Sequence, residues 1–258
     1  MPFFLFEGLL ECGLEAKLEG KEARHAIKSR RLRPGEIFEI QDSQTERFQA
    51  RILERKRDSL GFVVEKRLII PRESPLKLEL WLALPKQKSL EWVLQKGTEL
   101  GVSNITVFRS RYSSGAARSL DLERGLSRWR RICMEACKQS GRTNTPELRV
   151  HQSLAEALSE NPLEGSGWLL STETSDSNQA GFPVDTDSAA HRLLVGPEGG
   201  WHDEEMQMAE DSGIKPIRLG PRVMRTETAV LAALAILQYL HGDMGILGGE
   251  HNFLDVTE

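Results

Sequence analysis

The sequence lacks the features of a membrane protein and of a disulfide-bonded secreted protein. No apolar run in its 258 residues approaches the roughly 20 residues that are needed to cross a bilayer. The first residues, MPFFLFEGLLEC, carry no basic stretch ahead of their apolar run, so we expect no signal peptide. The chain has only 3 cysteines, too few for a disulfide framework. We therefore expect a cytoplasmic protein that has no membrane partner.

Ligands for a metal and a histidine base are also scarce. Cys133 and Cys137 stand one helical turn apart, but no further Cys or His follows at ligand spacing. We therefore expect no metal site and two half-buried helical thiols. His191 precedes a predicted strand and His202 takes the position of a helix N-cap, so we expect both to be structural.

The charges are divided unevenly along the chain. Residues 1–150 hold 29 Lys and Arg against 20 Asp and Glu, a net charge of +9. Residues 151–258 hold 5 against 18, a net charge of −13. The formal net charge of −4 hides this division. A basic first part suggests that this part of the chain meets a polyanion.

The first part of the chain has the pattern of a small β domain. Short segments with period-two alternation, at 36–41, 47–54 and 60–69, are separated by polar turns. This pattern predicts a small antiparallel barrel or sandwich. The run PRESP at 71–75 then resembles a linker, so we expect a domain over 1–73 and a second domain over 74–258.

After the linker, predicted strands alternate with predicted helices. This alternation is typical of a mostly parallel sheet with helices on both faces. Ser89 and Thr226 are the expected N-caps of the first and last helices. Strands are predicted at 77–84, 104–108, 147–151, 167–171, 191–195 and 214–219, and helices at 89–101, 121–140, 153–160, 203–212 and 226–241.

Unusual residues gather where three of these strands end. The stretches are LLSTET at 169–174, GPEGGW at 196–201 and LGPRVMRTETAV at 219–230. Open α/β sheets bind ligands at the carboxyl ends of their strands. A glycine turn before a helix often holds a phosphate, but Asp203, Glu204 and Glu205 would repel one here. In the third stretch, Arg222 and Arg225 place two cations beside the N–H groups of a helix start.

Four motifs in the same order resemble one family. They are LPKQKSLEWVLQKGTELGV, EACKQSGRTNTPEL, GPEGGW and LGPRVMRTETA, and they resemble the ribosomal RNA small subunit methyltransferase E family over nearly the whole chain. The resemblance implies a SPOUT-type trefoil-knotted α/β domain behind a PUA-like barrel. It also implies a homodimer that transfers a methyl group from S-adenosylmethionine to N3 of one uridine in 16S ribosomal RNA, within the assembled small subunit. For the dimer interface, the long helix bearing Trp129, Cys133 and Cys137 offers apolar area.

Two alternatives stay open. One is a methyltransferase of the same fold that acts on another position of ribosomal or transfer RNA; the run Arg225-Thr226-Glu227 favours the uridine reaction. The other is a non-catalytic RNA-binding assembly factor, against which the GPEGG turn argues.

The resemblance also gives a set of expected site residues. An acidic helix start suits S-adenosylmethionine, which carries a sulfonium cation and no phosphate. Arg225 is the first catalytic candidate, because it would stabilise negative charge on O2 and O4 of uracil; Glu227 would orient Arg225 or relay the proton. The expected cofactor-binding residues are Leu170, Thr172, Gly196, Pro197, Glu198, Gly199, Gly200, Leu219, Gly220, Val223, Met224, Arg225 and Thr226.

RNA contacts are expected from the basic part of the chain. We also expect Lys138, near the end of the long helix, to contact RNA. Two departures from the family pattern affect the barrel: the chain starts MPFFLF without an arginine, and HAIKSRR has Ser29 and Arg30 where an apolar pair is usual. The expected RNA-binding residues are Lys28, Arg30, Arg31, Arg33, Lys86, Gln139 and Arg142.

Overall fold

The computed structural model divides into two compact units. It describes residues 3–28, 30–69, 73–113, 115, 121–172, 181–183 and 188–245. The barrel unit comprises Met1–Glu73 with Arg130–Thr145, and the α/β unit comprises Ser74–Trp129 with Pro146–Glu258. The expected domains, 1–73 and 74–258, are stretches of sequence that would fold on their own. The compact units do not test independent folding, so these boundaries stay a prediction.

The barrel unit is built on a five-stranded sheet with the order β1-β3-β4-β5-β2. β1 pairs with β3 in parallel, and the other neighbours are antiparallel. One helix, α1, connects β2 to β3 along the chain. The elements are β1 (Phe4–Leu5), β2 (Glu15–Leu18), α1 (Gly20–Lys28), β3 (Ile37–Gln41), β4 (Arg47–Arg55) and β5 (Leu60–Arg67).

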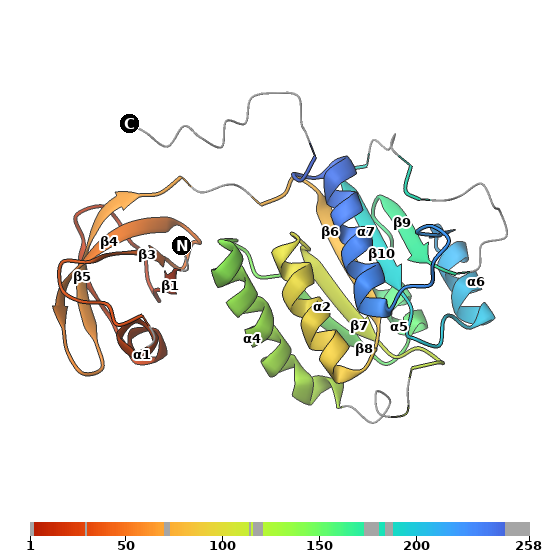
Figure 1. Cartoon of the computed structure of the whole chain (residues 1–258), viewed down its shortest axis with the longest axis horizontal. Helices are drawn as coiled ribbons and strands as arrows, with labels where there is room; N and C mark the ends of the chain where they lie inside the picture. Colours follow the sequence, from red (N-terminus) through yellow and green to blue (C-terminus); the bar gives the residue numbers. More distant parts are fainter. Residues whose placement is uncertain are drawn as a thin grey trace. The chain divides into compact units, whose positions relative to one another are not determined.

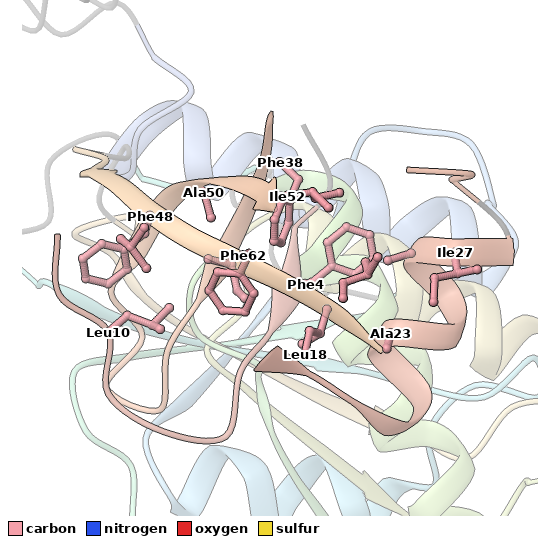
Figure 2. Packing of buried hydrophobic residues seen from close by; sticks show 14 residues of the cluster. Phe4, Leu10, Leu18, Ala23, Ile27, Phe38, Phe48, Ala50, Ile52 and Phe62 are labelled. Carbon is pink, nitrogen blue, oxygen red and sulfur yellow. The ribbon is translucent and has the colours of Figure 1, made fainter. Parts of the chain in front are cut away.

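Aromatic rings fill the core of this unit (Figure 2). Phe38 meets Phe4 and Phe62 edge to face, with ring centroids 5.8 and 5.6 Å apart. Helix α1 adds Ala23 and Ile27, which are four residues apart and therefore lie on one helical face. This helix was not predicted, because its nine residues were read as part of a strand-rich region.

The α/β unit is built on a parallel six-stranded sheet with the order β11-β9-β10-β6-β7-β8. The predicted fold class, a mostly parallel sheet behind a small β-rich barrel, is confirmed. The strands are β6 (Lys77–Ala83), β7 (Asn104–Phe108), β8 (Glu147–His151), β9 (Ser166–Leu170), β10 (Ala190–Val195) and β11 (Ile214–Ile217). The helices are α2 (Gln87–Glu99), α5 (Leu154–Glu160), α6 (Asp203–Asp211) and α7 (Thr226–His241). Helix α4 (Leu122–Ser140) begins in this unit, and its part from Arg130 onward belongs to the barrel unit.

Helices cover both faces of this sheet. α2 and α7 lie side by side across one face (Figure 1). On that face, Leu80 of β6 lies beside Gly97 of α2 and Leu234 of α7. On the other face, Trp81 of β6 belongs to a buried cluster that also contains residues of α5 and α6. Adjacent residues of β6 therefore point to opposite layers, as a buried parallel strand requires.

Two helix starts differ from the predictions. α2 begins at Gln87 with Lys86 at the N-cap, so the predicted cap at Ser89 is wrong. α7 begins at Thr226 with Arg225 at the N-cap, so the predicted cap at Thr226 is also wrong. Neither observed N-cap uses its side chain to bind a backbone N–H group. Ser and Thr are favoured at N-caps, but a helix can also start without a capping side chain, because most helical stability in a protein comes from packing of the apolar face.

Several predictions fall outside the described residues. They concern Met1 and Pro2, Ser29, residues 71–72 of the linker, and most of the polar connection at 171–189. The trefoil knot stays a prediction. No described helix is both long and apolar enough to span a membrane.

Candidate active site

The loops that follow β9, β10 and β11 line one cavity of about 530 Å³. These strands are neighbours in a parallel sheet, so their carboxyl ends meet at one edge. All the residues expected to bind the cofactor line this cavity, although they come from three separate stretches of sequence. They are Leu170, Thr172, Gly196, Pro197, Glu198, Gly199, Gly200, Leu219, Gly220, Val223, Met224, Arg225 and Thr226.

Sequence reasoning missed several lining residues, of which Trp201 is the most informative. Its indole Nε1 donates a hydrogen bond to the carbonyl oxygen of Leu170, at 2.9 Å. Its ring stacks on Phe108, with centroids 6.2 Å apart. Trp201 therefore ties the loop after β10 to the end of β9. The others that were not predicted to bind are Ser171, Val195, Met206, Arg218, Arg222 and Ala229.

The three glycines of the GPEGG turn are required for different reasons. A Cβ at Gly196 would lie 3.0 Å from the Trp201 indole, and a Cβ at Gly199 would lie 3.0 Å from Cβ of Tyr112. Gly200 instead has φ +76°, a backbone conformation that favours glycine. The close neighbours of Gly196 and Gly199 thus include side chains of the protein itself.

A capping box fixes the start of α6. His202 is the N-cap, as predicted, and its Nδ1 accepts a hydrogen bond from the backbone N–H of Glu204. The Glu205 carboxylate accepts from the backbone N–H of His202 at 3.2 Å. It also accepts from Ser110 Oγ at 2.9 Å and from the backbone N–H of Arg111 at 3.1 Å. Glu205 is only 8% exposed, so it joins α6 to the loop after β7 rather than facing solvent.

The opposite side of the cavity is cationic. Arg225 is exposed at the N-cap of α7, where the positive end of the helix dipole adds to its own charge. Within the described part of the chain, no hydrogen bond or ion pair engages the side chain of Arg222 or Arg225. Glu227 lies in the first turn of α7, outside the residues that line the cavity. The catalytic roles of Arg225 and Glu227 stay predictions.

His191 is buried at the other end of its strand. It lies within β10 rather than before it, and its Nδ1 accepts a hydrogen bond from Trp168 Nε1 at 2.9 Å. Its ring stacks on His241 at 4.5 Å. Burial, and then the neighbouring His241, lower the pKa of His191 to about 4. The ring is therefore neutral near pH 7, in line with the expected structural role.

Most residues expected to bind RNA are exposed, and two basic ones are not. Lys28, Arg30, Arg31, Arg33, Lys86 and Gln139 are exposed. Arg142 forms an ion pair with Glu73 at 2.7 Å, and its side chain is 11% exposed. Lys138 is buried and pairs with Glu22 at 2.7 Å, so its expected phosphate contact is wrong. The roles of the others stay predictions.

The Glu73 carboxylate holds the turn after α4. Burial alone would raise the pKa of Glu73, but hydrogen bonds from Arg142 and from the backbone N–H groups of Asn144 and Thr143 outweigh burial and lower this pKa. Glu73 is therefore a charged partner of Arg142, and a phosphate would have to compete with it.

One group of possible metal ligands occurs among the described residues. Ligand atoms of His151, Glu156 and Glu160 all lie within 4.8 Å of one another. However, the Glu156 carboxylate accepts a hydrogen bond from the backbone N–H of Gln152 at 2.6 Å. His151 Nδ1 lies 3.7 Å from the Glu160 carboxylate. A hydrogen bond at the helix start and a close contact between the imidazole and a carboxylate account for this group, so we assign no metal to it.

Two family models match the chain. An RNA methyltransferase domain matches residues 72–238, and an RNA methyltransferase PUA domain matches residues 18–65. The first match contains every residue that lines the cavity.

Proteins of known name and structure match nearly the whole chain. Ribosomal RNA small subunit methyltransferase E of Buchnera aphidicola subsp. Schizaphis graminum is 30% identical over 233 residues, which are 87% of this chain and 90% of that protein. The crystal structure of a ribosomal RNA small subunit methyltransferase E from Neisseria gonorrhoeae bound to S-adenosyl methionine is 32% identical. Its TM-score is 0.82, over 94% of this chain and 99% of that one. A putative methyltransferase from Legionella pneumophila, in complex with the same cofactor, is 31% identical with a TM-score of 0.80, over 94% and 98% of the two chains. The chain therefore belongs to the ribosomal RNA small subunit methyltransferase E family.

Proposed function

We propose that the protein transfers a methyl group from S-adenosylmethionine to N3 of one uridine in 16S ribosomal RNA. The observation that carries this proposal is the single cavity at which the loops after β9, β10 and β11 meet. The Neisseria gonorrhoeae relative, which is bound to S-adenosyl methionine, supports the choice of cofactor. A ribosomal substrate also agrees with the expected cytoplasmic location.

The residues of the cavity suit this cofactor. A volume of about 530 Å³ lies in the range of pockets that enclose molecules of this size. Leu219 and Met224 offer an apolar slot for adenine, with main-chain groups at its edge. The turn from Gly196 to Gly200 offers backbone groups to the ribose and the methionine end. Glu198 supplies an exposed carboxylate on the same wall, compatible with a cation.

The target atom determines which group must assist. When bound, S-adenosylmethionine supplies an electrophilic methyl group on a positively charged sulfur. N3 of uracil carries a weakly acidic proton between two carbonyl groups. This proton has to leave before or during the attack of N3 on the methyl group, and the negative charge that develops spreads onto O2 and O4. The Arg225 guanidinium lines the cavity and has no described partner, so it is available to stabilise this charge. One such donor is worth roughly two to three powers of ten in rate.

Glu227 has a narrower role in this proposal. It does not line the cavity, so it would act by orienting Arg225 or by accepting the proton through another group. A carboxylate in the first turn of a helix also stabilises the helix dipole.

The substrate RNA must open to reach the cavity. N3 lies on the Watson–Crick edge of uracil, so the uridine has to leave its pair or stack. Lys28, Arg30, Arg31 and Arg33 form an exposed basic segment in the barrel unit that suits the phosphate backbone. We propose the assembled small subunit as the substrate, since it presents a fixed RNA conformation.

The homodimer belongs to this proposal, but its predicted surface needs correction. Cys133 and Cys137 are buried rather than half-buried, and Trp129 is buried as well, so the three offer no free apolar area on α4. Ile236 and Tyr239 of α7 are exposed and are better candidates for an interface. Light scattering at low micromolar concentration should give the mass of a dimer, and a fully active monomer would refute this part of the proposal.

The decisive test is to identify the methylated nucleoside. Small subunits and naked 16S RNA that lack the modification are incubated with the protein and labelled S-adenosylmethionine, and their nucleosides are analysed by mass spectrometry. We expect 3-methyluridine, with faster transfer to the assembled subunit. Another methylated nucleoside would assign a different target. Failure to bind S-adenosylmethionine at millimolar concentration in calorimetry would instead leave a non-catalytic assembly factor.

A further inference from the structure

An exposed tyrosine stands at the rim of the cavity. Tyr112 lies in the loop after β7, and a Cβ placed on Gly199 would come within 3.0 Å of its Cβ and 3.2 Å of its carbonyl oxygen. Gly199 lines the cavity and Tyr112 does not. We propose, on the basis of the function proposed above, that Tyr112 stacks on a nucleobase of the substrate RNA next to the target uridine.

The ring of Tyr112 has a surface free to take a base. Tyr112 is 48% exposed, although burial of a large aromatic side chain is favourable. Its ring contacts His202, with centroids 5.6 Å apart and planes inclined by 59°. This contact limits the movement of the ring and leaves much of it open. Aromatic side chains stack on any nucleobase, because every base has a π face.

The loop that carries Tyr112 is held in place. Glu205 binds Ser110 Oγ and the backbone N–H of Arg111, which immediately precede Tyr112. The backbone N–H of Ser113 donates to the carbonyl oxygen of Ser110 at 3.1 Å, and Ser113 Oγ accepts from the backbone N–H of Ser110 at 3.2 Å. A ring on such a fixed turn loses little conformational entropy when a ligand stacks on it.

The same carboxylate also fixes the cofactor side. Glu205 accepts a hydrogen bond from the backbone N–H of His202, at the end of the turn that contains Gly199. One buried group therefore sets both the turn predicted to hold the cofactor and the position of Tyr112. A base stacked on this ring would keep a constant position relative to the cofactor turn, which is what placement of the neighbouring uridine requires.

The surroundings of Tyr112 favour RNA over a protein partner. Its neighbours Arg111 and Glu204 are exposed and form an ion pair at 2.7 Å. Arg222 and Arg225, whose side chains have no described partner, line the same cavity as Gly199. An apolar protein partner would need a contiguous apolar patch, whereas a single ring among charged groups suits a base on a phosphate chain. Because Tyr112 does not line the cavity, it serves a flanking base rather than the target itself.

The test compares two variants at Tyr112. Tyr112→Phe keeps an aromatic ring, and Tyr112→Leu keeps apolar contact with Gly199 but removes the ring. For Tyr112→Leu we expect the KM for small subunits, and the Kd for fluorescein-labelled single-stranded RNA, to rise about tenfold. Tyr112→Phe should change both by less than about twofold, because the ring face is retained.

Two further measurements separate stacking from a structural role. The Kd for S-adenosylmethionine should be unchanged in both variants, since neither alters the cavity lining. Trp92→Leu is the control, because Trp92 is a similarly exposed aromatic residue on α2, away from the cavity lining, and should have no effect.

Three results would overturn the stacking proposal. They are normal RNA affinity and KM for Tyr112→Leu, an equal loss of cofactor affinity in that variant, and an absence of RNA binding by the unaltered protein. If the unaltered protein binds RNA but transfers no methyl group, the proposed function fails while the RNA affinities still decide the role of Tyr112.

Discussion

The two sides of the cavity are built in opposite ways. On the side of the GPEGG turn, Trp201 binds the end of β9 and Glu205 binds three hydrogen-bond donors. On the side of α7, Arg222 and Arg225 have no partner within the described residues, and Val223 is 79% exposed. One side is fixed by the protein's own contacts, whereas the side chains of Arg222 and Arg225 on the other side make no described contact.

This difference has a physical basis. A surface that holds a cofactor must keep its backbone groups in place before the ligand arrives, and buried hydrogen bonds do this. An exposed arginine is well solvated, so leaving it unpaired costs little. Its interaction with a developing negative charge becomes stronger once RNA displaces water from the site. Substitutions on the two sides should therefore fail in different ways.

The largest effect is expected for Arg225→Ala. Removing the guanidinium should lower the turnover number by about two powers of ten or more, because the charge on uracil would lose its donor. The Kd for S-adenosylmethionine and the melting temperature should stay nearly unchanged, since no described contact depends on this side chain. Single-turnover kinetics with saturating RNA measure the first quantity, and calorimetry measures the other two.

The matched variant is Arg225→Lys. It should recover only part of the rate, because one ammonium group does not reproduce the planar guanidinium fork. Normal turnover of Arg225→Ala at saturating RNA would show that Arg225 only docks the substrate. Glu227, Gln139 and Arg142 would then be the next candidates.

Gly199→Val should weaken cofactor binding on the fixed side. A valine side chain would meet Tyr112, which lies 3.0 Å from the position of its Cβ, so the turn or the loop must move. We expect the Kd for S-adenosylmethionine in calorimetry to rise at least about tenfold, since overpacking commonly costs about 1–3 kcal/mol. Gly115→Val is the control, because Gly115 does not line the cavity and no atom lies within 4 Å of its added Cβ. We expect this variant to bind S-adenosylmethionine like the unaltered protein. Equal cofactor affinity in Gly199→Val and the unaltered protein would contradict the role given to this turn.

Glu205→Ala should lower stability rather than chemistry. It removes the acceptor of three hydrogen bonds at a nearly buried position, and we expect the free energy of unfolding in urea to fall by about 1–3 kcal/mol. Glu204→Ala removes an exposed carboxylate one residue earlier and should change this free energy by less than about 0.5 kcal/mol. Similar losses in the two variants would mean that Glu205 does not hold the loop.

These contrasts also show what the sequence could predict. The three stretches that line the cavity were found because parallel strands place their carboxyl ends at one edge, a rule that needs only the order of strands and helices. The individual cofactor-binding residues within them came from the resemblance to the family. The inward role of Glu205 was not found, because three consecutive acids at a helix start all suit the dipole equally well. Only the fold brings Ser110 within reach of one of them, across 95 residues of sequence.

The other features that were not predicted concern contacts between residues that are far apart in the sequence. Lys138 lies in the last turn of a basic helix and Arg142 lies just after it, so both resemble phosphate contacts in sequence. Their partners Glu22 and Glu73 are 116 and 69 residues away, so no local pattern reveals them. The apolar stripe of α4 was likewise read as a free surface, because periodicity identifies a buried face without saying what covers it.

The smallest effect is expected at the basic segment of the barrel unit, which is not part of the lining of the candidate active site. Arg31, like Arg225, is exposed and has no described side-chain partner. Arg31→Ala should raise the KM for RNA a few fold and reduce the slope of log affinity against log salt by about one, as expected for one lost phosphate contact. The turnover number should not change, because Arg31 is not among the residues that line the cavity.

Arg142→Ala provides the contrast: it breaks the ion pair with Glu73, so it should lower stability more than it lowers the salt dependence of binding. Kinetics at several salt concentrations, together with urea unfolding, separate the two outcomes. A fall in turnover for Arg31→Ala with an unchanged salt slope would contradict this assignment, in which Arg225 assists the reaction and Arg31 only binds RNA.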